Sequence, residues 1–384
     1  MKYILLLIIS GSVFALPDYK DPEILARSSL IDADHMPVAS LFVDATPTIT
    51  NDRRVGIPLS VIEGQEVSGI WTSFKGESRV PYYRVDNFRI SNFEFYKDSF
   101  LFTVYNEYFY EDLILGSAIG NEYKFDSLKL SFPLEKIKKV TLLSNGYSVF
   151  GAIENKLIGK VYSDRLEIIE EENKNNISYL FAPSFNHLGQ VVYKVRLGKT
   201  GELNEERPDQ IRLKTLANKV KLIAVDKDYD VNSKWISLRN SVSINDSGHI
   251  CFFAVDTEGK THLILFKNGT YHTIAIEGED DIAALDYFSA VLNNKGLIAF
   301  RAHDISGNAS VFISDGHKSK KIFSQNSIIH TRHENFLVSY GPHIPFGGNI
   351  AMNDLGDIVI NTGLASEDGK RDRGRSLVII YSKE

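Results

Sequence analysis

Two turns of the chain place an Asn and an Asp side by side just ahead of a Gly, at Asn245-Asp246 and at Asn353-Asp354. Oxygen-bearing side chains of this kind can bind calcium, but a calcium loop needs several oxygen ligands that converge from one loop. Each of these turns offers at most two. We therefore interpret them as turns in which the Asn side chain bonds its own backbone, and we expect no metal ion and no cofactor.

Histidines and one cysteine are the other residues that could do chemistry. His330 and His333 are three residues apart, so on an extended strand they point to opposite faces and form a poor metal pair, even with His343 added. His303 is followed by an Asp that could orient it as a general base, but no nucleophile lies nearby in the sequence. Cys251 is the single cysteine, and its strand-like surroundings indicate an inert core thiol.

Aromatic and histidine side chains are the strongest candidates for contacts with a ligand, because Trp and Tyr are good anchors. Packing between sheets is the alternative for most of them. The candidate binding residues are Trp71, Tyr179, Trp235, Tyr287, His303, Tyr340 and His343.

These candidates must be positioned by a repeated element. The phrase apolar-Asn-x-x-Gly followed by a β-rich run occurs four times, and fainter copies occur at 30–43, 95–104 and 143–152, so we count seven units. Each clear copy continues with two more β-rich runs that are separated by a turn such as Asn268-Gly269 or Asp315-Gly316. The four clear copies begin at Phe185, Ile244, Leu292 and Met352.

Four short strands in a unit of 40 to 60 residues are typical of a propeller blade. The sequence therefore predicts an all-β protein: a seven-bladed β-propeller of four-stranded antiparallel blades in a single domain, 16–384. The last unit lacks its fourth strand, and the segment 22–28 would fill that place and close the ring. The stretch 206–224 is interpreted as the third and fourth strands of the fourth unit.

The connections between strands differ at the two ends of such blades. We name the strands of a blade a to d, so the a–b and c–d turns share one face and the b–c and d–a connections share the other. The irregular segments 44–54, 198–209 and 365–375 are interpreted as b–c loops, and 324–348 as a d–a connection. Function usually lies where loops vary on a rigid frame, so we expect the binding surface on this second face. Arg371, Arg373 and Arg375 would form a basic cluster there.

The N-terminus and the composition indicate the compartment. Lys2 precedes the apolar run 3–9, and Ala15 ends a short segment that is typical of a signal-peptide cleavage site. We expect a cleaved signal peptide, 1–15, and a secreted or periplasmic protein with no membrane span. The net charge of −6 excludes a general nucleic-acid binder, whose surface would be basic.

The phrase at Asn293, Gly296, Ala299 and Phe300 resembles a family of secreted bacterial tandem-repeat proteins with Asn-x-x-Gly-x-Val-Ala-Phe repeats. The match covers 182–384 well and 22–181 poorly. The resemblance implies a β-propeller-like fold and export, and it carries no catalytic residues across.

The sequence favours a non-catalytic binding or scaffolding protein of the bacterial envelope or exterior, with a protein or glycan ligand on the loop-rich face. A carbohydrate-active hydrolase or lyase, with its site at the mouth of the central channel, is the alternative. It would require convergent carboxylates or a metal ion there.

Overall fold

The computed structural model describes residues 16–30, 32–42, 45–85, 88–105, 111–128, 137–142, 149–153, 157–162, 165–172, 174–199, 208–339 and 344–383. The regular structure in this part of the chain consists of β-strands without a helix, as expected from runs of β-branched and aromatic residues such as "ICFFAVD" at 250–256. The predicted signal peptide, 1–15, lies outside the described residues. None of the described segments is a helix that could span a membrane.

The described strands form seven antiparallel sheets, which we number 1 to 7 in chain order. In sheets 1 to 3 each strand pairs with the next one along the chain. Sheet 1 consists of β2 (Thr48–Ile49), β3 (Val55–Leu59), β4 (Ser68–Phe74) and β5 (Glu77–Arg84). Sheet 2 consists of β6 (Arg89–Tyr96), β7 (Ser99–Tyr105), β8 (Glu111–Ile119) and β9 (Glu122–Leu128). Sheet 3 consists of β10 (Ile137–Leu142), β11 (Val149–Ile153), β12 (Leu157–Val161) and β13 (Leu166–Glu171).

Sheets 4 to 6 follow the same order, but their first strand is irregular. It is divided into two segments in sheets 4 and 6, and its register shifts between Leu238 and Val242 in sheet 5. Sheet 4 consists of β14 (Ile177–Leu180), β15 (Ser184–Phe185), β16 (Val191–Leu197), β17 (Asp209–Lys214) and β18 (Val220–Val225). Sheet 5 consists of β19 (Trp235–Ile244), β20 (Ile250–Asp256), β21 (Thr261–Lys267) and β22 (Thr270–Ile276). Sheet 6 consists of β23 (Ile282–Leu285), β24 (Val291–Leu292), β25 (Ile298–Asp304), β26 (Ala309–Ser314) and β27 (Ser319–Ser324).

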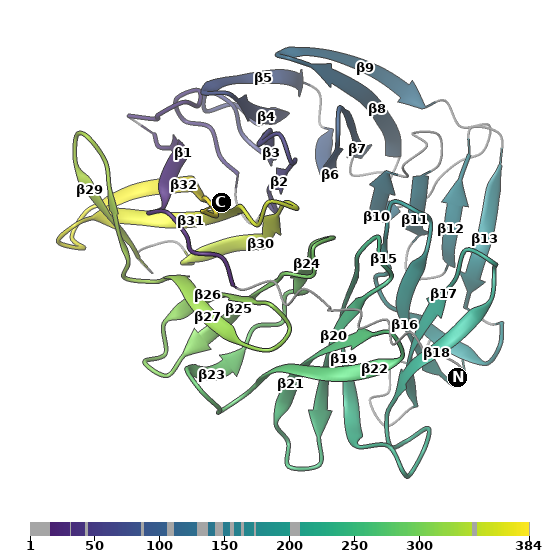
Figure 1. The fold of residues 1–384 in the computed structure, drawn as a ribbon. Coiled ribbons are helices and arrows are strands. Elements are labelled where there is room, and N and C mark those ends of the chain that lie inside the picture. Colours follow the sequence, from purple (N-terminus) through teal and green to yellow (C-terminus); the bar gives the residue numbers. More distant parts are fainter. Residues whose placement is uncertain are drawn as a thin grey trace, which may run out of the picture.

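Sheet 7 combines strands from both ends of the chain. β1 (Glu23–Ser28) pairs antiparallel with β32 (Asp372–Ile380), with Glu23 opposite Ile379, so the segment 22–28 lies beside the last unit as the sequence predicts (Figure 1). The remaining strands of sheet 7 are β28 (Ile328–His330), β29 (Asn335–Val338), β30 (Phe346–Met352) and β31 (Ile358–Ser366).

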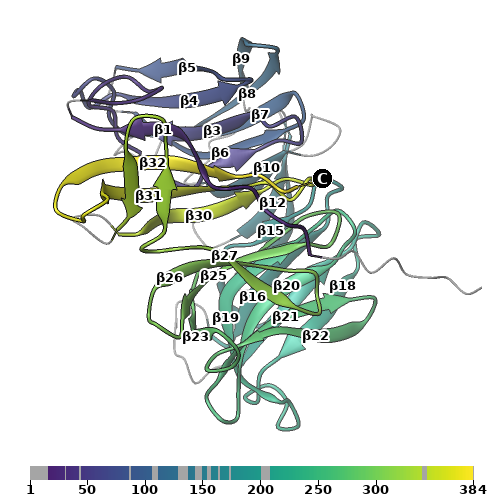
Figure 2. The ribbon, with the colours of Figure 1, turned by 60° about the vertical axis from the view of Figure 1, so that its left-hand side comes forward.

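The sheets follow one another in chain order around the molecule, and the view turned by 60° shows sheet 7 between sheets 1 and 6 (Figures 1 and 2). Neighbouring sheets share apolar layers. Sheets 4 and 5, for example, bury Val192, Ile211, Phe252 and Ile264 in one cluster. Sheets 7 and 1 share another cluster, so the first and last parts of the chain pack together as neighbours do elsewhere.

Two details of the repeated units can be compared with the sequence. Residues 206–224 include β17 and β18, so their interpretation as strands is confirmed. Asn268 and Gly269 form a two-residue turn with φ of 53° and 82°, as this dipeptide predicts. The Asp315-Gly316 turn is longer than two residues, because Ser314 pairs with Ser319.

The predicted first unit is misplaced. Residues 32–42 contain isolated bridges but no strand, and the first hairpin is β2–β3, whose first strand and turn lie in the segment 44–54 that we predicted to be a b–c loop. In this hairpin Thr50 occupies the place of the turn Asn, and Arg53, with φ of 67°, occupies the place of the Gly. The substitution of both signature residues concealed the turn in the sequence.

Candidate ligand-binding site

The two ends of the sheets are built differently. We call the end that carries the β15–β16, β19–β20, β24–β25 and β30–β31 turns the turn end. The opposite end carries the b–c and d–a connections, and we call it the connection end.

At the turn end, the Asn of each repeat bonds both its own turn and the next sheet. The Oδ1 atom of Asn245 accepts a hydrogen bond from the His249 amide (2.9 Å), which confirms the predicted turn. Its Nδ2 atom donates to the carbonyl oxygen of Asn293 in sheet 6 (2.9 Å). Asn186, Asn293 and Asn353 make the corresponding bonds, and the last of these donates to Thr50 of sheet 1. The result is a belt of buried amides across sheets 4, 5, 6, 7 and 1.

A second belt runs beside the first, through the residues that follow these Asn residues. Each backbone amide donates to the side chain of the next sheet, for example Asp246 to Asn294 (2.9 Å) and Asn294 to Asp354 (2.8 Å). At one end of this belt, His187 stacks on Tyr96 of sheet 2 (3.8 Å between ring centroids). Its ring nitrogens lie 3.3 Å from Asp246 and 3.5 Å from Glu94.

The charges around His187 decide its protonation. Burial alone would lower the pKa of His187, but the hydrogen bond to Asp246 and the nearby carboxylate of Glu94 raise the pKa to about 9. The imidazolium is therefore part of the belt at neutral pH. Every Asp and Asn of these turns is bonded to a neighbouring residue. The turn end therefore holds neighbouring sheets together.

At the connection end, side chains from the second strand of several sheets reach the next sheet. Lys194 of β16 donates to the carbonyl oxygen of Leu238 in sheet 5 (2.5 Å) and lies 2.6 Å from Asp209. Arg301 of β25 donates to Gly348 of sheet 7 and lies 2.8 Å from Asp286. Each cation is eight residues beyond its turn Asn, and so is Asn361, which donates to Phe42 (2.9 Å).

An aromatic ring accompanies each of the two cations. Phe181, from the irregular part of the first strand of sheet 4, lies 4.3 Å from Lys194. Phe288, from the corresponding part of sheet 6, lies 4.2 Å from Arg301. The cation on the second strand is therefore held under an aromatic ring of the first strand.

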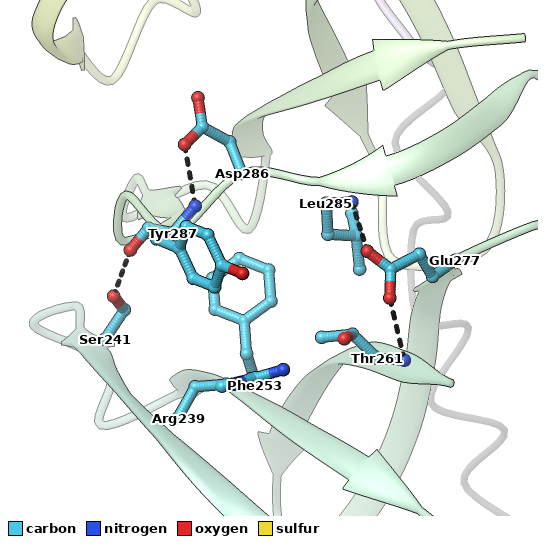
Figure 3. Close-up of a pocket in the computed structure, with 8 residues that line it drawn as sticks. All are labelled: Arg239, Ser241, Phe253, Thr261, Glu277, Leu285, Asp286 and Tyr287. Atoms are coloured by element: carbon cyan, nitrogen blue, oxygen red, sulfur yellow. Dashed lines mark hydrogen bonds between the residues drawn. The ribbon is translucent and has the colours of Figure 1, made fainter. Parts of the chain in front are cut away.

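Sheet 5 has these two residue types exchanged. Its second strand carries Phe253 at the position of Lys194 and Arg301, and the irregular part of its first strand carries Arg239. A pocket of about 80 Å³, partly open to solvent, lies here between sheets 5 and 6. In Figure 3, Tyr287 and Ser241 lie on one side of this pocket, and Glu277 and Thr261 lie on the other.

The pocket walls are fixed by hydrogen bonds. Glu277 accepts from the amides of Thr261 (3.3 Å) and Leu285 (3.1 Å), and the Ser241 hydroxyl donates to the Tyr287 carbonyl oxygen. The Tyr287 ring itself is 76% exposed, and Arg239 lies 5.6 Å from its centroid. The pocket thus combines a fixed polar frame with an accessible aromatic ring.

The structure separates the predicted binding residues. Trp71 and Trp235 are buried in apolar layers between sheets, which was the packing alternative for them. Tyr179 is half-buried on β14, with its ring 4.8 Å from that of Phe181. His303 is exposed on β25, and Tyr287 lines the pocket. Tyr340 and His343 lie outside the described residues.

Sequence reasoning missed most of the pocket residues. Asp286 belongs to an acidic stretch, 279–286, that the sequence analysis did not connect with a site, but it bonds Arg301. Arg239 and Glu277 had no recognised pattern. Phe253 at the position that holds Lys194 and Arg301, visible when the repeats are aligned on their Asn residues, is the signal that could have found the site.

The predicted arginine cluster is wrong. Arg371 is exposed, but Arg375 is buried and bonds Asn361 (2.9 Å). Arg373 lies on β32 and bonds Glu334 (2.7 Å). Only one of the three arginines therefore extends from the β31–β32 connection.

Metal and thiol chemistry find no support among the described residues. No group of three His, Cys, Asp or Glu side chains in this part of the chain could hold a metal ion, and His330 bonds Asn335. Cys251 is buried, and burial raises the pKa of its thiol. The prediction of a core thiol is confirmed.

Comparison with known proteins identifies the fold alone. No known protein family and no curated protein matches the chain. The chain is similar to the β-propeller domain of the Trilobed protease from Pyrococcus furiosus, which has an open velcro topology. The TM-score is 0.56 at 12% identity, over 90% of this chain and 97% of that one.

Two peptidase structures are also similar. One is a puromycin-hydrolyzing peptidase of Mycobacterium tuberculosis (TM-score 0.50, 8% identity, 87% of this chain). The other is a prolyl endopeptidase (TM-score 0.52, 11% identity, 88% of this chain). The chain spans 53% and 50% of their lengths. The protein is thus an all-β, β-propeller-like chain.

Proposed function

We propose that the chain is an exported seven-bladed β-propeller that binds a protein or glycan ligand at its connection end without chemical conversion. The pairing of β1 with β32 would close the ring. The apolar layer shared by sheets 7 and 1 supports this closure, because each blade can bury its faces only against its neighbours. The apolar segment at 3–9 supports export.

The pocket between sheets 5 and 6 is the observation that carries the proposal. It lies at the connection end, where the connecting segments vary from sheet to sheet. At the opposite end, the side chains of the two belts are already bonded to neighbouring sheets. An exposed Tyr beside a fixed polar frame is typical of a ligand anchor. Tyr287 is therefore the central contact of the proposed surface.

The carboxylates of the pocket support binding over catalysis. Glu277 accepts two backbone hydrogen bonds, and Asp286 pairs with Arg301 and accepts from the Tyr287 amide (2.7 Å). A general acid or base must exchange its proton with a substrate, and the carboxylate oxygens of both groups are already occupied by partners within the protein. A hydrolase or lyase would need a carboxylate that is free of such partners.

A binding survey with matched variants tests the proposal. The wild-type protein, Tyr287→Ala and Tyr83→Ala would be applied to a glycan array and to envelope pull-downs. Tyr83 is an exposed Tyr on the edge strand β5, outside the pocket. We expect ligand capture that Tyr287→Ala weakens at least tenfold, the typical loss of an aromatic anchor, and that Tyr83→Ala leaves unchanged.

Three results would contradict the proposal. The first is an absence of any captured ligand, and the second is equal capture by Tyr287→Ala. The third is cleavage of a captured glycan during incubation with the wild-type protein. Intact mass of the protein recovered from the medium or periplasm tests export, since the mature chain should begin at Leu16.

A further inference from the structure

Arg239 differs from Lys194 and Arg301 in having no carboxylate partner among the described residues. Lys194 lies 2.6 Å from Asp209 and Arg301 lies 2.8 Å from Asp286. Among the described residues, no carboxylate lies within ion-pair distance of Arg239, and its buried Nε atom has no hydrogen-bond partner there. The guanidinium charge is therefore not balanced by a neighbouring carboxylate, and a ligand that brings a carboxylate to the guanidinium is favoured.

The exchange of residue types explains why this cation is available. In sheets 4 and 6 the cation projects from the second strand and is fixed between sheets under a Phe ring. In sheet 5 the Phe253 ring fills that buried position, and the cation lies on the irregular first strand beside Tyr287. In sheet 5 the cation therefore lies in the wall of a pocket, whereas in sheets 4 and 6 it lies between sheets.

The other charges of the pocket restrict the anion. Arg239 contributes one positive charge, and Glu277 and Asp286 contribute two carboxylates, of which only Asp286 has a basic partner. Glu277 repels any anion, and it repels a dianion such as phosphate more strongly than a single carboxylate. A single carboxylate can pair with the planar guanidinium through two parallel hydrogen bonds.

The size and the aromatic lining of the pocket restrict the part of the ligand that carries the anionic group. The pocket is smaller than typical ligand pockets, so it admits at most one ring-sized group, part of which remains in solvent. The Tyr287 ring and the Phe253 ring both line that space. We infer that the pocket binds a six-membered ring carrying one carboxylate, with Arg239 on the carboxylate and Tyr287 against the ring.

This inference rests on the proposed ligand-binding role of the connection end, and small probes test it separately. Benzoate and glucuronate carry the carboxylate on an aromatic ring and on a sugar ring, and benzamide and glucose are their neutral counterparts. Binding would be measured by ligand-observed NMR and calorimetry on the full-length protein. Arg239→Gln removes the charge, and Arg371→Gln removes an exposed charge outside the pocket.

We expect one or both carboxylates to bind, with at least tenfold weaker binding of the neutral counterparts and of inorganic phosphate. Arg239→Gln should weaken binding at least tenfold, and Arg371→Gln should leave it unchanged. The carboxylate that binds identifies the ligand as aromatic or as a uronic acid. A thermal melt of Arg239→Gln equal to that of the wild type verifies that the variant is folded.

The inference is overturned if neither carboxylate binds, if the neutral probes bind equally, or if folded Arg239→Gln binds as the wild type does. Ligand capture that depends on Tyr287 but not on Arg239 would refute only this inference. Capture that is independent of Tyr287 would refute the proposed function as well.

Discussion

The turn end and the connection end of this molecule are built from the same strands but use their polar residues differently. At the turn end, Asn186, Asn245, Asn293 and Asn353 repeat one bonding pattern from sheet to sheet. At the connection end, one equivalent position holds Lys194, Phe253, Arg301 or Asn361.

The difference shows how stability and recognition can be divided in a repeat protein. The turn end needs identical residues, because each amide must meet the carbonyl of the next sheet. The connection end already has its strands in place, so a single exchange can open a pocket without disturbing the frame. Residues that recognise a ligand are therefore expected at positions that differ between the repeats, and residues that stabilise the fold at positions that recur in most of them.

The largest effect is expected from breaking the buried belt at the turn end. Asn293→Ala removes the bond to the Asn353 carbonyl (3.0 Å) and the acceptor of the Leu297 amide (2.9 Å). Because unpaired buried groups remain, the free energy of unfolding should fall by about 3 kcal/mol. Urea denaturation measures this loss.

The exposed neighbour Asn294 provides the control for this measurement. Its side chain bonds Asp246 and Asp354 at the surface, so Asn294→Ala should cost about 1 kcal/mol or less. Equal losses for the two variants would show that burial of the belt does not determine its contribution.

A smaller effect is expected from pH at the His187 end of the belt. The pKa of His187 is about 9 in the folded protein and about 6.5 in the unfolded chain. A raised pKa means that protonation stabilises the fold fully below pH 6.5, and that this contribution is lost as the pH rises to 9. The full difference between these pKa values corresponds to about 3 kcal/mol. Because the His187 side chain is 24% exposed, solvent screens part of this effect, and we expect the free energy of unfolding to fall by about 2 kcal/mol between pH 6 and pH 10.

The variant His187→Gln tests the origin of this pH dependence. It should flatten the profile between pH 6 and 10, since it removes the titrating group and keeps a hydrogen-bond donor. His249 does not interfere in this range, because burial and Lys267 lower its pKa. An unchanged slope in His187→Gln would assign the dependence to other groups.

The smallest effect on stability is expected from restoring sheet 5 to the pattern of its neighbours. The double variant Arg239→Phe/Phe253→Arg recreates the arrangement of Phe181 and Lys194, so its unfolding free energy should lie within about 1 kcal/mol of the wild type. The pocket should be filled and carboxylate binding lost. Phe253→Arg alone should be clearly less stable, because it buries a second guanidinium near Arg239. If the double variant is as unstable as Phe253→Arg alone, sheet 5 does not adopt the arrangement of its neighbours.

The repeats made the architecture predictable where the Asn and Gly signature is intact. Most strands from β14 onward, the turn chemistry of Asn245 and the pairing partner of 22–28 follow from local rules on turns and strand edges. The exceptions are β28 and β29, which lie in the segment 324–348 that we interpreted as a d–a connection. The first hairpin could not be located, because Thr50 and Arg53 adopt the turn without the expected residue types. At this turn the rest of the fold holds Arg53 in the left-handed backbone conformation that a Gly adopts more easily.

The candidate site was only partly predictable. The choice of Tyr287 followed from residue type and from the expected end of the blade. The role of Arg239 depends on which side chain fills the gap between sheets 5 and 6, and that is a property of packing. Trp71 illustrates the opposite case, since its indole is buried and donates to the His35 carbonyl (2.8 Å).

The pairing of β1 with β32 has a consequence for folding. These strands are some 350 residues apart, so their contact is among the most non-local that this chain can make. The N-terminal strand emerges first during synthesis or translocation and must wait for the final residues before its edge is covered. Until then Ala26 and its neighbours expose an unpaired strand edge, so the nascent protein is most vulnerable to aggregation and proteolysis just before its last strand arrives.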